Sequence, residues 1–226
     1  MATSEVIIRL KEVSFGYPGN PEDAPVLQQV NLELERGQRV GLVGANGSGK
    51  TTLFHLIMGL LKPSKGEVEI FGRKRVEEKD FREVRSRIGL LFQDPDDQLF
   101  CPTVAEDVAF GPLNLGKTQE EALAIVKQVL AELGLQGFEQ RLTYKLSGGE
   151  KQLVALATVL AMQPEVLILD EPSTGLDEHT VDRLVHILEN SQLTYLVASH
   201  NRDFLARTTD VIYRLAEGRI YKTALP

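Results

Sequence analysis

Apolar and polar residues alternate along two stretches near the start of the chain. Residues 6–10 and 30–34 both favour strands, because a period of two places every second side chain on one face. A Gly-Asn-Pro sequence at 19–21 separates the two stretches and favours a loop. Residues 5–36 are therefore predicted to be extended.

Beyond residue 36, short apolar runs alternate with segments of helical spacing. We expect strands at 39–43, 66–71, 88–92, 166–169, 194–199 and 211–214, and helices at 50–58, 119–133, 147–162, 178–189 and from Asn201, with a final turn at Gly218. The run 88–92 is apolar throughout, which favours a strand buried on both faces. The alternation predicts an α/β fold with a largely parallel sheet and helices on both of its faces.

Residues 94–145 interrupt this alternation. Pro95, Pro102 and Pro112 divide the segment, and helical spacing appears over 119–133. We therefore expect a mostly helical subdomain inserted between two strands of the sheet. Ser147, which follows this segment, is predicted to cap the helix that runs to Met162.

The composition excludes several classes of protein. The 226 residues include 25 Lys or Arg and 32 Asp or Glu, so the formal net charge is −7. This acidic balance argues against a nucleic-acid-binding protein, which would carry a basic surface. The apolar fraction of 42% suffices for one sizeable core or two small ones. A single cysteine, Cys101, excludes a disulfide scaffold and indicates a reducing compartment; we expect a buried or half-buried side chain there.

Membrane segments are not evident in the sequence. The longest apolar run, 153–162, is about half the roughly 20 residues that span a bilayer. The start of the chain lacks the basic and long apolar segments of a signal peptide. Any membrane role is therefore expected to be peripheral.

The strongest single motif is a phosphate-binding loop. Residues 44–51 read Gly-Ala-Asn-Gly-Ser-Gly-Lys-Thr, which fits G-x-x-x-x-G-K-[ST] between a predicted strand and a predicted helix. Glycines allow successive backbone N–H groups to face an anion, and the helix N-terminus adds partial positive charge. Lys50 is expected to contact the β- and γ-phosphates, and the Thr51 hydroxyl to bind Mg²⁺.

Two carboxylates follow the predicted strand 166–169. Parallel strands place their carboxyl ends at one sheet edge, so Asp170 and Glu171 are expected beside the phosphate loop. Asp170 would hold Mg²⁺ through its water shell. Glu171 would orient or deprotonate an attacking water. The alternative is a pair of solvated acids at the end of a strand. The presence of the phosphate loop makes this alternative less favoured.

A family resemblance becomes visible at residues 146–150. Their sequence, Leu-Ser-Gly-Gly-Glu, resembles the signature motif of ABC-type ATPases. Tyr17 resembles the aromatic residue that stacks on adenine, Gln93 the Gln-loop glutamine and His200 the switch histidine. Residues 173–177, Ser-Thr-Gly-Leu-Asp, resemble the D-loop. Together with the phosphate loop and the carboxylates, these motifs occur in the family's order across the whole chain.

The resemblance implies the fold and the domain division. It implies one ABC ATPase domain over 1–226, with a RecA-like P-loop NTPase core and an antiparallel β-subdomain over 1–93 and 163–226. The helical subdomain would cover 94–162. In this family two such domains face each other head to tail, and each ATP lies between one chain's phosphate loop and the other chain's signature. Ser147, Gly148 and Gly149 open a helix, so they offer the second anion site that such a dimer uses.

The resemblance also implies the cofactors, ATP and Mg²⁺, and the roles of individual residues. Glu171 would be the general base, His200 would contact the γ-phosphate and the attacking water, and Gln93 would contact Mg²⁺ or that water. The metal site would comprise Thr51, Gln93 and Asp170. The nucleotide would be bound, across the two chains, by Tyr17, Gly44, Ala45, Asn46, Gly47, Ser48, Gly49, Lys50, Thr51, Thr52, Ser147, Gly148, Gly149, Glu150 and Asp177.

Some histidines and one signature residue stand apart from this pattern. His55, His179 and His186 fit no site, and packing or surface positions are expected for them. Glu150 stands where glutamine is commonest in the family. A carboxylate there would repel the partner's γ-phosphate unless a cation compensates its charge, and Lys151 is the cation we expect to do so.

The segment after Gln93 indicates which group of ABC-type ATPases the chain resembles. Residues 91–100, Leu-Phe-Gln-Asp-Pro-Asp-Asp-Gln-Leu-Phe, and the following 103–115 resemble the ATPase subunits of energy-coupling-factor importers, and among them the cobalt and nickel type. In that family this groove receives arginine-bearing coupling helices of a membrane protein. Asp94, Asp96 and Asp97 suit such a partner, and a solvated acidic turn is the alternative.

The resemblance therefore implies an ATPase subunit at the cytoplasmic face of the cell membrane. Its partners would be a second ATPase chain, either identical or a paralogue, a membrane coupling protein and a substrate-binding membrane subunit; no nucleic acid is expected. Many energy-coupling ATPases carry a further C-terminal stretch that keeps the dimer together. This chain stops at Pro226, so we expect a monomer until ATP binds.

Two other functions compete with import of cobalt or nickel. A vitamin importer would use the same ATPase, because nucleotide domains do not touch the transported substrate. A soluble ABC ATPase is the second alternative. The acidic segment 94–97 argues against a soluble ABC ATPase. A DNA-repair ATPase would have a long coiled-coil insertion and a translation-type protein a second ATPase half, and the sequence shows neither. A nucleotide sensor without hydrolysis would lack Glu171 or His200, and both are present.

Overall fold

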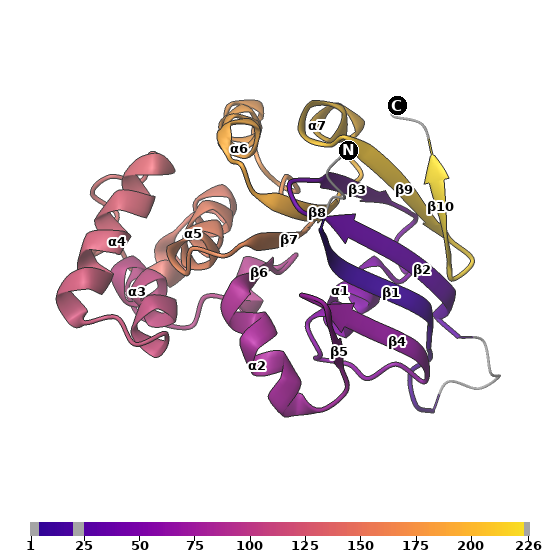
Figure 1. The fold of residues 1–226 in the computed structure, drawn as a ribbon. Helices are drawn as coiled ribbons and strands as arrows, with labels where there is room; N and C mark the ends of the chain where they lie inside the picture. Colours follow the sequence, from indigo (N-terminus) through magenta and orange to yellow (C-terminus); the bar gives the residue numbers. More distant parts are fainter. Residues whose placement is uncertain (1–4, 20–24, 224–226) are drawn as a thin grey trace.

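Two β-sheets form the framework of the chain (Figure 1). The computed structural model describes residues 5–19 and 25–223. Within them, four antiparallel strands form one sheet in the order β2-β1-β4-β5: β1 (Val6–Phe15), β2 (Leu27–Glu35), β4 (Lys65–Ile70) and β5 (Arg73–Arg75). The extended conformation predicted for the start of the chain is confirmed. The predicted loop at 19–21 lies largely outside the described residues.

The second sheet has six strands in the order β10-β9-β3-β8-β7-β6. Its strands are β3 (Arg39–Val43), β6 (Ile88–Leu91), β7 (Val166–Asp170), β8 (Thr194–Ala198), β9 (Val211–Ala216) and β10 (Arg219–Thr223). Every neighbouring pair is parallel except β10 with β9. The prediction of a largely parallel sheet is confirmed.

The central strands of the parallel sheet, β7 and β8, are covered on both faces. Every residue of β7 and of β8 is buried. Leu167 and Leu169 belong to one hydrophobic core, while Val166 and Ile168 belong to the other, as the period of two requires. One core includes the apolar faces of α6 (Glu178–Asn190) and α7 (Arg202–Thr208), and the other includes α1 (Lys50–Ile57) and the antiparallel sheet.

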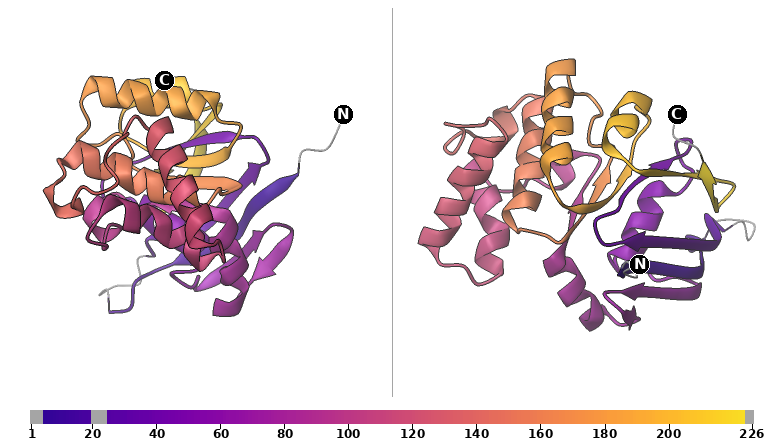
Figure 2. Two further views of the ribbon diagram at one scale, coloured as in Figure 1. Left: turned by 90° about the vertical axis from the view of Figure 1, so that its left-hand side faces the viewer. Right: turned by 45° about the horizontal axis from the view of Figure 1, so that its top comes forward.

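Three helices form a separate group beside the sheets (Figure 2). They are α3 (Val104–Asn114), α4 (Gln119–Glu132) and α5 (Gly148–Ala161), and they lie between β6 and β7 in the chain, as predicted. Each begins with a capping box, in which Thr103, Thr118 or Ser147 exchanges hydrogen bonds with a glutamate three residues later. The cap predicted at Ser147 and the helix to Met162 are thus confirmed. The 3₁₀ turn η1 (Pro95–Asp97) precedes α3, and a second 3₁₀ turn, η2 (Thr143–Lys145), lies between α4 and α5.

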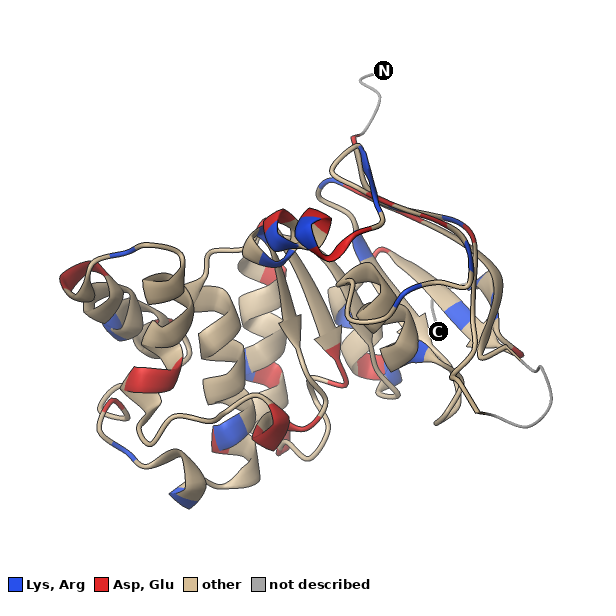
Figure 3. Ribbon diagram, turned by 90° about the horizontal axis from the view of Figure 1, so that it is seen from below, with Lys and Arg blue, Asp and Glu red and all other residues tan. Residues whose placement is uncertain are grey.

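Helix α2 (Glu78–Arg87) and strands β5 and β10 were not predicted. Acidic and basic residues alternate along α2 (Figure 3), and only Phe81 and Val84 are buried, so its apolar pattern is too short to recognise. Strand β10 is exposed or half-exposed along its length and is held by its pairing with β9.

One smaller expectation, for Cys101, is also met. Cys101 is half-buried, and burial is the main cause that raises the pKa of its thiol to about 11. Among the described residues, no helix combines the length and the apolar character that a membrane crossing requires.

The packing of β6 against α5 generates a test of stability. A Cβ added at Gly89 would lie 2.3 Å from Val159 Cγ1, whereas one added at Gly16 would lie 3.7 Å from its nearest neighbour, Pro25 Cα. We expect Gly89→Ala to lower the free energy of unfolding by about 1–3 kcal/mol through overpacking, measured by urea denaturation. Gly16→Ala is the matched control and should change it by less than about 0.5 kcal/mol. Equal stabilities of the two variants would contradict this packing.

Candidate nucleotide-binding site

The predicted phosphate loop connects β3 to α1 and is shaped by its glycines. Gly49 has φ 104° and a Cβ there would lie 2.9 Å from Val26 Cγ1, so only glycine fits. A Cβ at Gly44 would lie 2.6 Å from the Leu215 carbonyl oxygen. No side chain caps α1 among the described residues, so its first N–H groups remain available to an anion.

Lys50 is held inside this loop. Its side chain is 8% exposed, and Nζ donates to the Gly44 carbonyl oxygen at 2.9 Å. The same nitrogen lies 3.3 Å from His200 Nε2 and 3.8 Å from Glu171 Oε1. An ammonium group placed in this way can contact phosphate oxygens with little rearrangement.

Asp170 lies at the end of β7 and contacts the start of α1. Thr51 Oγ1 donates to Asp170 Oδ2 at 2.5 Å, and Asp170 Oδ1 is buried without a hydrogen-bond partner in the described chain. Burial raises the pKa of Asp170, and the Thr51 hydrogen bond opposes that shift. The carboxylate therefore has one oxygen still free to bind a further ligand.

Glu171 is fixed beside Asp170 by backbone and side-chain contacts. Its φ of 49° lies in the left-handed region, which is unfavourable for a residue with a Cβ, and its N–H donates to the Ala198 carbonyl oxygen. The His200 N–H donates to Glu171 Oε2 at 3.2 Å, and His200 Nε2 lies 3.1 Å from Glu171 Oε1. His200 Nε2 also lies 2.8 Å from Asn46 Oδ1 in the phosphate loop. The carboxylate, the imidazole and the loop therefore meet at one point.

A cavity of about 410 Å³ lies in front of these groups. It is lined by Tyr17, Val26, Asn46, Gly47, Ser48, Gly49, Lys50, Thr51, Thr52, Gln93, Asp170 and Glu171. Of these residues the sequence analysis missed only Val26, a single apolar residue in a loop without a motif. Gly44, Ala45 and His200 line a neighbouring hollow on the other side of the loop. Tyr17 packs edge-on against Phe15, and the residue is 45% exposed, as a side chain that stacks on a base would be.

Comparisons with known proteins agree with this arrangement. The family described as "ABC transporter" matches residues 27–174, which is more than half of the chain. The energy-coupling factor transporter ATP-binding protein EcfA of Methanothermobacter thermautotrophicus is 42% identical over 97% of this chain and 71% of its own length. The chain belongs to the ABC transporter ATP-binding family. This ABC ATPase hydrolyses ATP, and its hydrolysis is coupled to transport in a transporter of the energy-coupling type.

Solved structures support the same assignment. The structure of cbiO1 from Clostridium perfringens, described as part of the ABC transporter complex cbiONQ, superposes with a TM-score of 0.83 at 34% identity, covering 96% of this chain and 87% of that one. A dimeric ATP-binding cassette in a post-hydrolysis state with ADP and Pi superposes with a TM-score of 0.89 at 28% identity, covering 97% and 99%. The RecA-like, P-loop fold class predicted from the sequence is therefore confirmed.

The signature of this ABC ATPase lies away from its own nucleotide cavity. Ser147 and Gly148 are exposed at the start of α5, and none of residues 147–150 is among those that line the cavity. A Cβ at Gly149 would lie 3.5 Å from Leu176 in the segment that resembles the D-loop. Asp177 caps α6 by accepting from the Thr180 N–H and hydroxyl, which lowers the pKa of Asp177, and it does not line the cavity either. One chain thus brings only part of the predicted site together.

The charge of Glu150 is compensated differently from our expectation. Glu150 Oε1 accepts from Arg141 Nη1 at 2.7 Å, while Oε2 accepts from the Ser147 N–H at 2.8 Å. The Ser147 and Arg141 hydrogen bonds lower the pKa of Glu150. Lys151, the expected cation, instead pairs with Asp96 Oδ1 at 2.5 Å, because successive helical residues face different sides of α5. Arg141 was missed because nothing in the sequence links it to the signature.

The groups around Asp170 fit a magnesium ion. A free buried carboxylate oxygen, the Thr51 hydroxyl and the Gln93 amide all offer the oxygen ligands that Mg²⁺ prefers. Within the described ranges no group of three or more His, Cys, Asp or Glu residues could hold a metal ion. Few protein ligands are typical of Mg²⁺ that is bound together with phosphates.

The remaining histidines have packing or surface positions, as expected. His55 on α1 is half-buried with its ring centroid 6.2 Å from that of Phe92, and burial lowers the pKa of His55. His179 and His186 are exposed.

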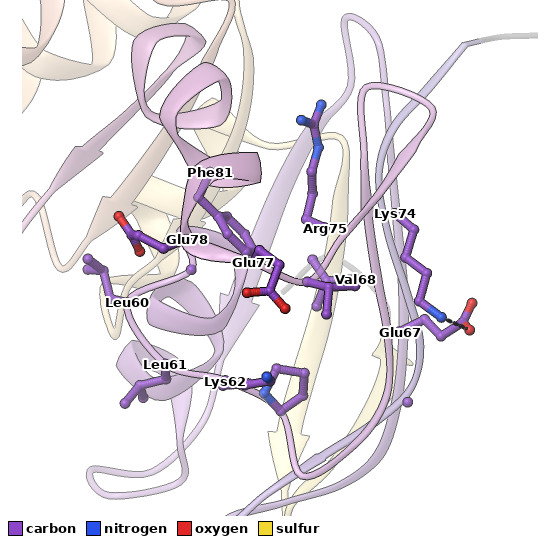
Figure 4. A pocket seen from close by; sticks show the side chains of 14 residues that line it. Leu60, Leu61, Lys62, Glu67, Val68, Lys74, Arg75, Glu77, Glu78 and Phe81 are labelled. Atoms are coloured by element: carbon purple, nitrogen blue, oxygen red, sulfur yellow. Dashed lines mark hydrogen bonds and ion pairs between the residues drawn. The ribbon is translucent and has the colours of Figure 1, made fainter.

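A further hollow of about 470 Å³ lies between the end of α1, the β4–β5 hairpin and α2 (Figure 4). Phe81 forms part of its wall, and Lys74 pairs with Glu67 at its edge. It is lined by no residue of the phosphate loop and by neither Asp170 nor Glu171. We therefore assign it no part in nucleotide chemistry.

Glu150 provides a test of the signature. In Glu150→Gln the amide oxygen can still accept from the Ser147 N–H, and only the half-exposed ion pair with Arg141 is lost, which costs under about 1 kcal/mol. We expect ATP-driven dimerisation, measured by light scattering, to be kept or strengthened because a negative charge is removed. Glu150→Ala removes the cap as well and should weaken dimerisation. A large loss of ATPase activity in Glu150→Gln would contradict this interpretation.

Proposed function

We propose that this ABC ATPase powers import of cobalt or nickel ions through ATP-driven closure of a dimer. Residues 1–226 act as one ATPase domain at the cytoplasmic face of the membrane. The observation that carries the proposal is an acidic and aromatic surface directly after Gln93, beside the nucleotide cavity. The sequence resemblance to cobalt and nickel importers and the similarity to cbiO1 support a metal-ion cargo.

The chemistry of the proposed reaction follows from the cavity. Lys50 and the N–H groups of α1 bind the phosphates, and Tyr17 offers an exposed ring for the adenine. Glu171 accepts a proton from the attacking water, and His200 holds that water in line with the γ-phosphate. Thr51, Asp170 and Gln93 would hold Mg²⁺, which would supply positive charge to the phosphates. The products are ADP and inorganic phosphate.

A second chain completes this site. Ser147 and Gly148 are exposed at the N-terminus of α5, which suits an anion, yet neither residue lines the cavity of its own chain. In a head-to-tail dimer the signature of one chain meets the γ-phosphate bound by the other. ATP then stabilises the dimer, and hydrolysis removes that stabilisation.

The surface after Gln93 suits a basic and apolar membrane partner. Asp94 and Asp97 are exposed in and next to η1, and Phe100 is 66% exposed. The Phe100 ring lies edge-on against that of Phe110, which is 48% exposed, with centroids 4.8 Å apart. Exposed aromatic residues next to carboxylates favour an amphipathic helix that carries arginine. A substrate-binding membrane subunit would complete the transporter.

The role of Glu171 is tested by removing its charge. Glu171→Gln keeps the shape of the side chain but not its basicity, so turnover should fall by about 10²–10⁴-fold while ATP still binds. The variant should accumulate as an ATP-bound dimer, measured by size-exclusion chromatography with and without ATP. Turnover close to that of the wild type would remove Glu171 from the role of general base.

The partners are tested by purifying the tagged chain from native membranes in mild detergent. An arginine-bearing membrane protein and a substrate-binding subunit should co-purify, and the ligand of that subunit distinguishes metal ions from vitamins. Phe100→Ser should reduce this co-purification about tenfold, as for an interface hot spot, whereas Tyr221→Ser, at an aromatic residue that is also exposed but lies on β10, should not. If only soluble proteins co-purify, the soluble ABC ATPase replaces the transporter.

A further inference from the structure

The side chain of Gln98 joins two parts of the chain that the proposed reaction uses. Its Oε1 accepts from the Phe92 N–H at 3.1 Å, and its Nε2 donates to the Ala155 carbonyl oxygen at 3.0 Å and to Thr158 Oγ1 at 2.8 Å. Phe92 directly precedes Gln93, which lines the nucleotide cavity. Ala155 and Thr158 belong to α5, the helix that begins at the signature. One amide group therefore connects the backbone of Phe92, the residue before Gln93, to the signature helix.

A second contact connects the same segments. Lys151 in the first turn of α5 pairs with Asp96 of η1, although the Asp96 side chain is 66% exposed and the pair therefore stabilises little. The turn itself is well defined, because Asp94 Oδ1 accepts from the Asp96 N–H at 2.9 Å. The 3₁₀ turn η1 thus lies between Gln93 and α5 as a short, internally hydrogen-bonded unit.

The chemistry of these contacts requires an amide at position 98. Gln98 is half-buried, and it accepts at one end and donates at the other. A carboxylate could accept from Phe92 but could not donate to the Ala155 carbonyl oxygen. The Phe92 side chain also faces His55 on α1. A movement of Phe92 together with Gln98 is therefore transmitted to α1, the helix that follows the phosphate loop.

We infer that Gln98 is a positioning residue. It fixes the position of Gln93 relative to the signature helix of the same chain. When Gln93 responds to the nucleotide in its own cavity, Gln98 moves the signature that this chain presents to the ATP of its partner. The inference rests on the proposed dimer. According to this inference, Gln98, an uncharged side chain outside the cavity, couples the two ATP sites.

The test compares Gln98→Met with the control Gln128→Met in the purified full chain, because Gln128 is an exposed glutamine on α4. Gln98→Met keeps the length of the side chain but removes all three hydrogen bonds, so kcat and ATP-driven dimerisation should fall about tenfold, the size expected for hydrogen bonds that are lost and not replaced. The Hill coefficient for ATP should fall from about 2 towards about 1, because the two sites become uncoupled. ATP affinity of the monomer should stay within about twofold of the wild type. Gln128→Met should change each quantity less than about twofold, because its exposed side chain donates to Glu132 of the same helix.

A double variant separates positioning from a purely structural role. If Gln98 acts through Gln93, adding Gln98→Met to Gln93→Ala should reduce kcat by less than about twofold further. All assays are run well below the melting temperature of each variant. Multiplicative losses in the double variant, or wild-type kcat and cooperativity in Gln98→Met, would overturn the inference. If the Glu171→Gln protein with native Gln98 forms no dimer with ATP, the proposed function itself fails, and the inference fails with it.

Discussion

The hydrogen bond from Thr51 to Asp170 is the contact on which the nucleotide site depends. It joins the first turn of α1 to the carboxyl end of β7. These two elements are far apart in the sequence, and β8 lies between β3 and β7 in the sheet. Because the contact fixes Asp170, it also fixes the neighbouring Glu171, whose carboxylate then meets His200 and Lys50. A parallel sheet makes this possible, since its strands deliver all these groups to one edge.

The parts of the site that lie within one motif could be predicted from the sequence. The phosphate loop needs glycine at fixed positions, and Gly44 and Gly49 are indeed places where a Cβ would clash. Caps are equally local: Ser147 and Glu150 are three residues apart and satisfy each other's backbone groups. The alternating pattern predicted the parallel sheet because each of its buried strands faces two cores.

The parts that depend on distant contacts could not be predicted. Val26 lines the cavity only because Gly49 leaves room for it. Arg141 neutralises Glu150 because η2 returns the chain to the start of α5, whereas the adjacent Lys151 faces another side of the helix. Strand β10 has no apolar pattern of its own and exists through its pairing with β9. In each case the deciding partner lies outside the local sequence.

The acidic turn after Gln93 has to meet two requirements at once. Its outward face, with Asp97 and the nearby Phe100, is exposed and free to meet a partner, while Gln98 is turned inward to α5. Asp96 lies between the two, since its carboxylate is exposed yet paired with Lys151 beside the signature. A basic group that approached this turn would therefore compete with Lys151 for Asp96. Because Lys151 directly follows the signature, binding at the outer face of η1 would change the charge beside the surface that, in the proposed dimer, meets the partner's ATP.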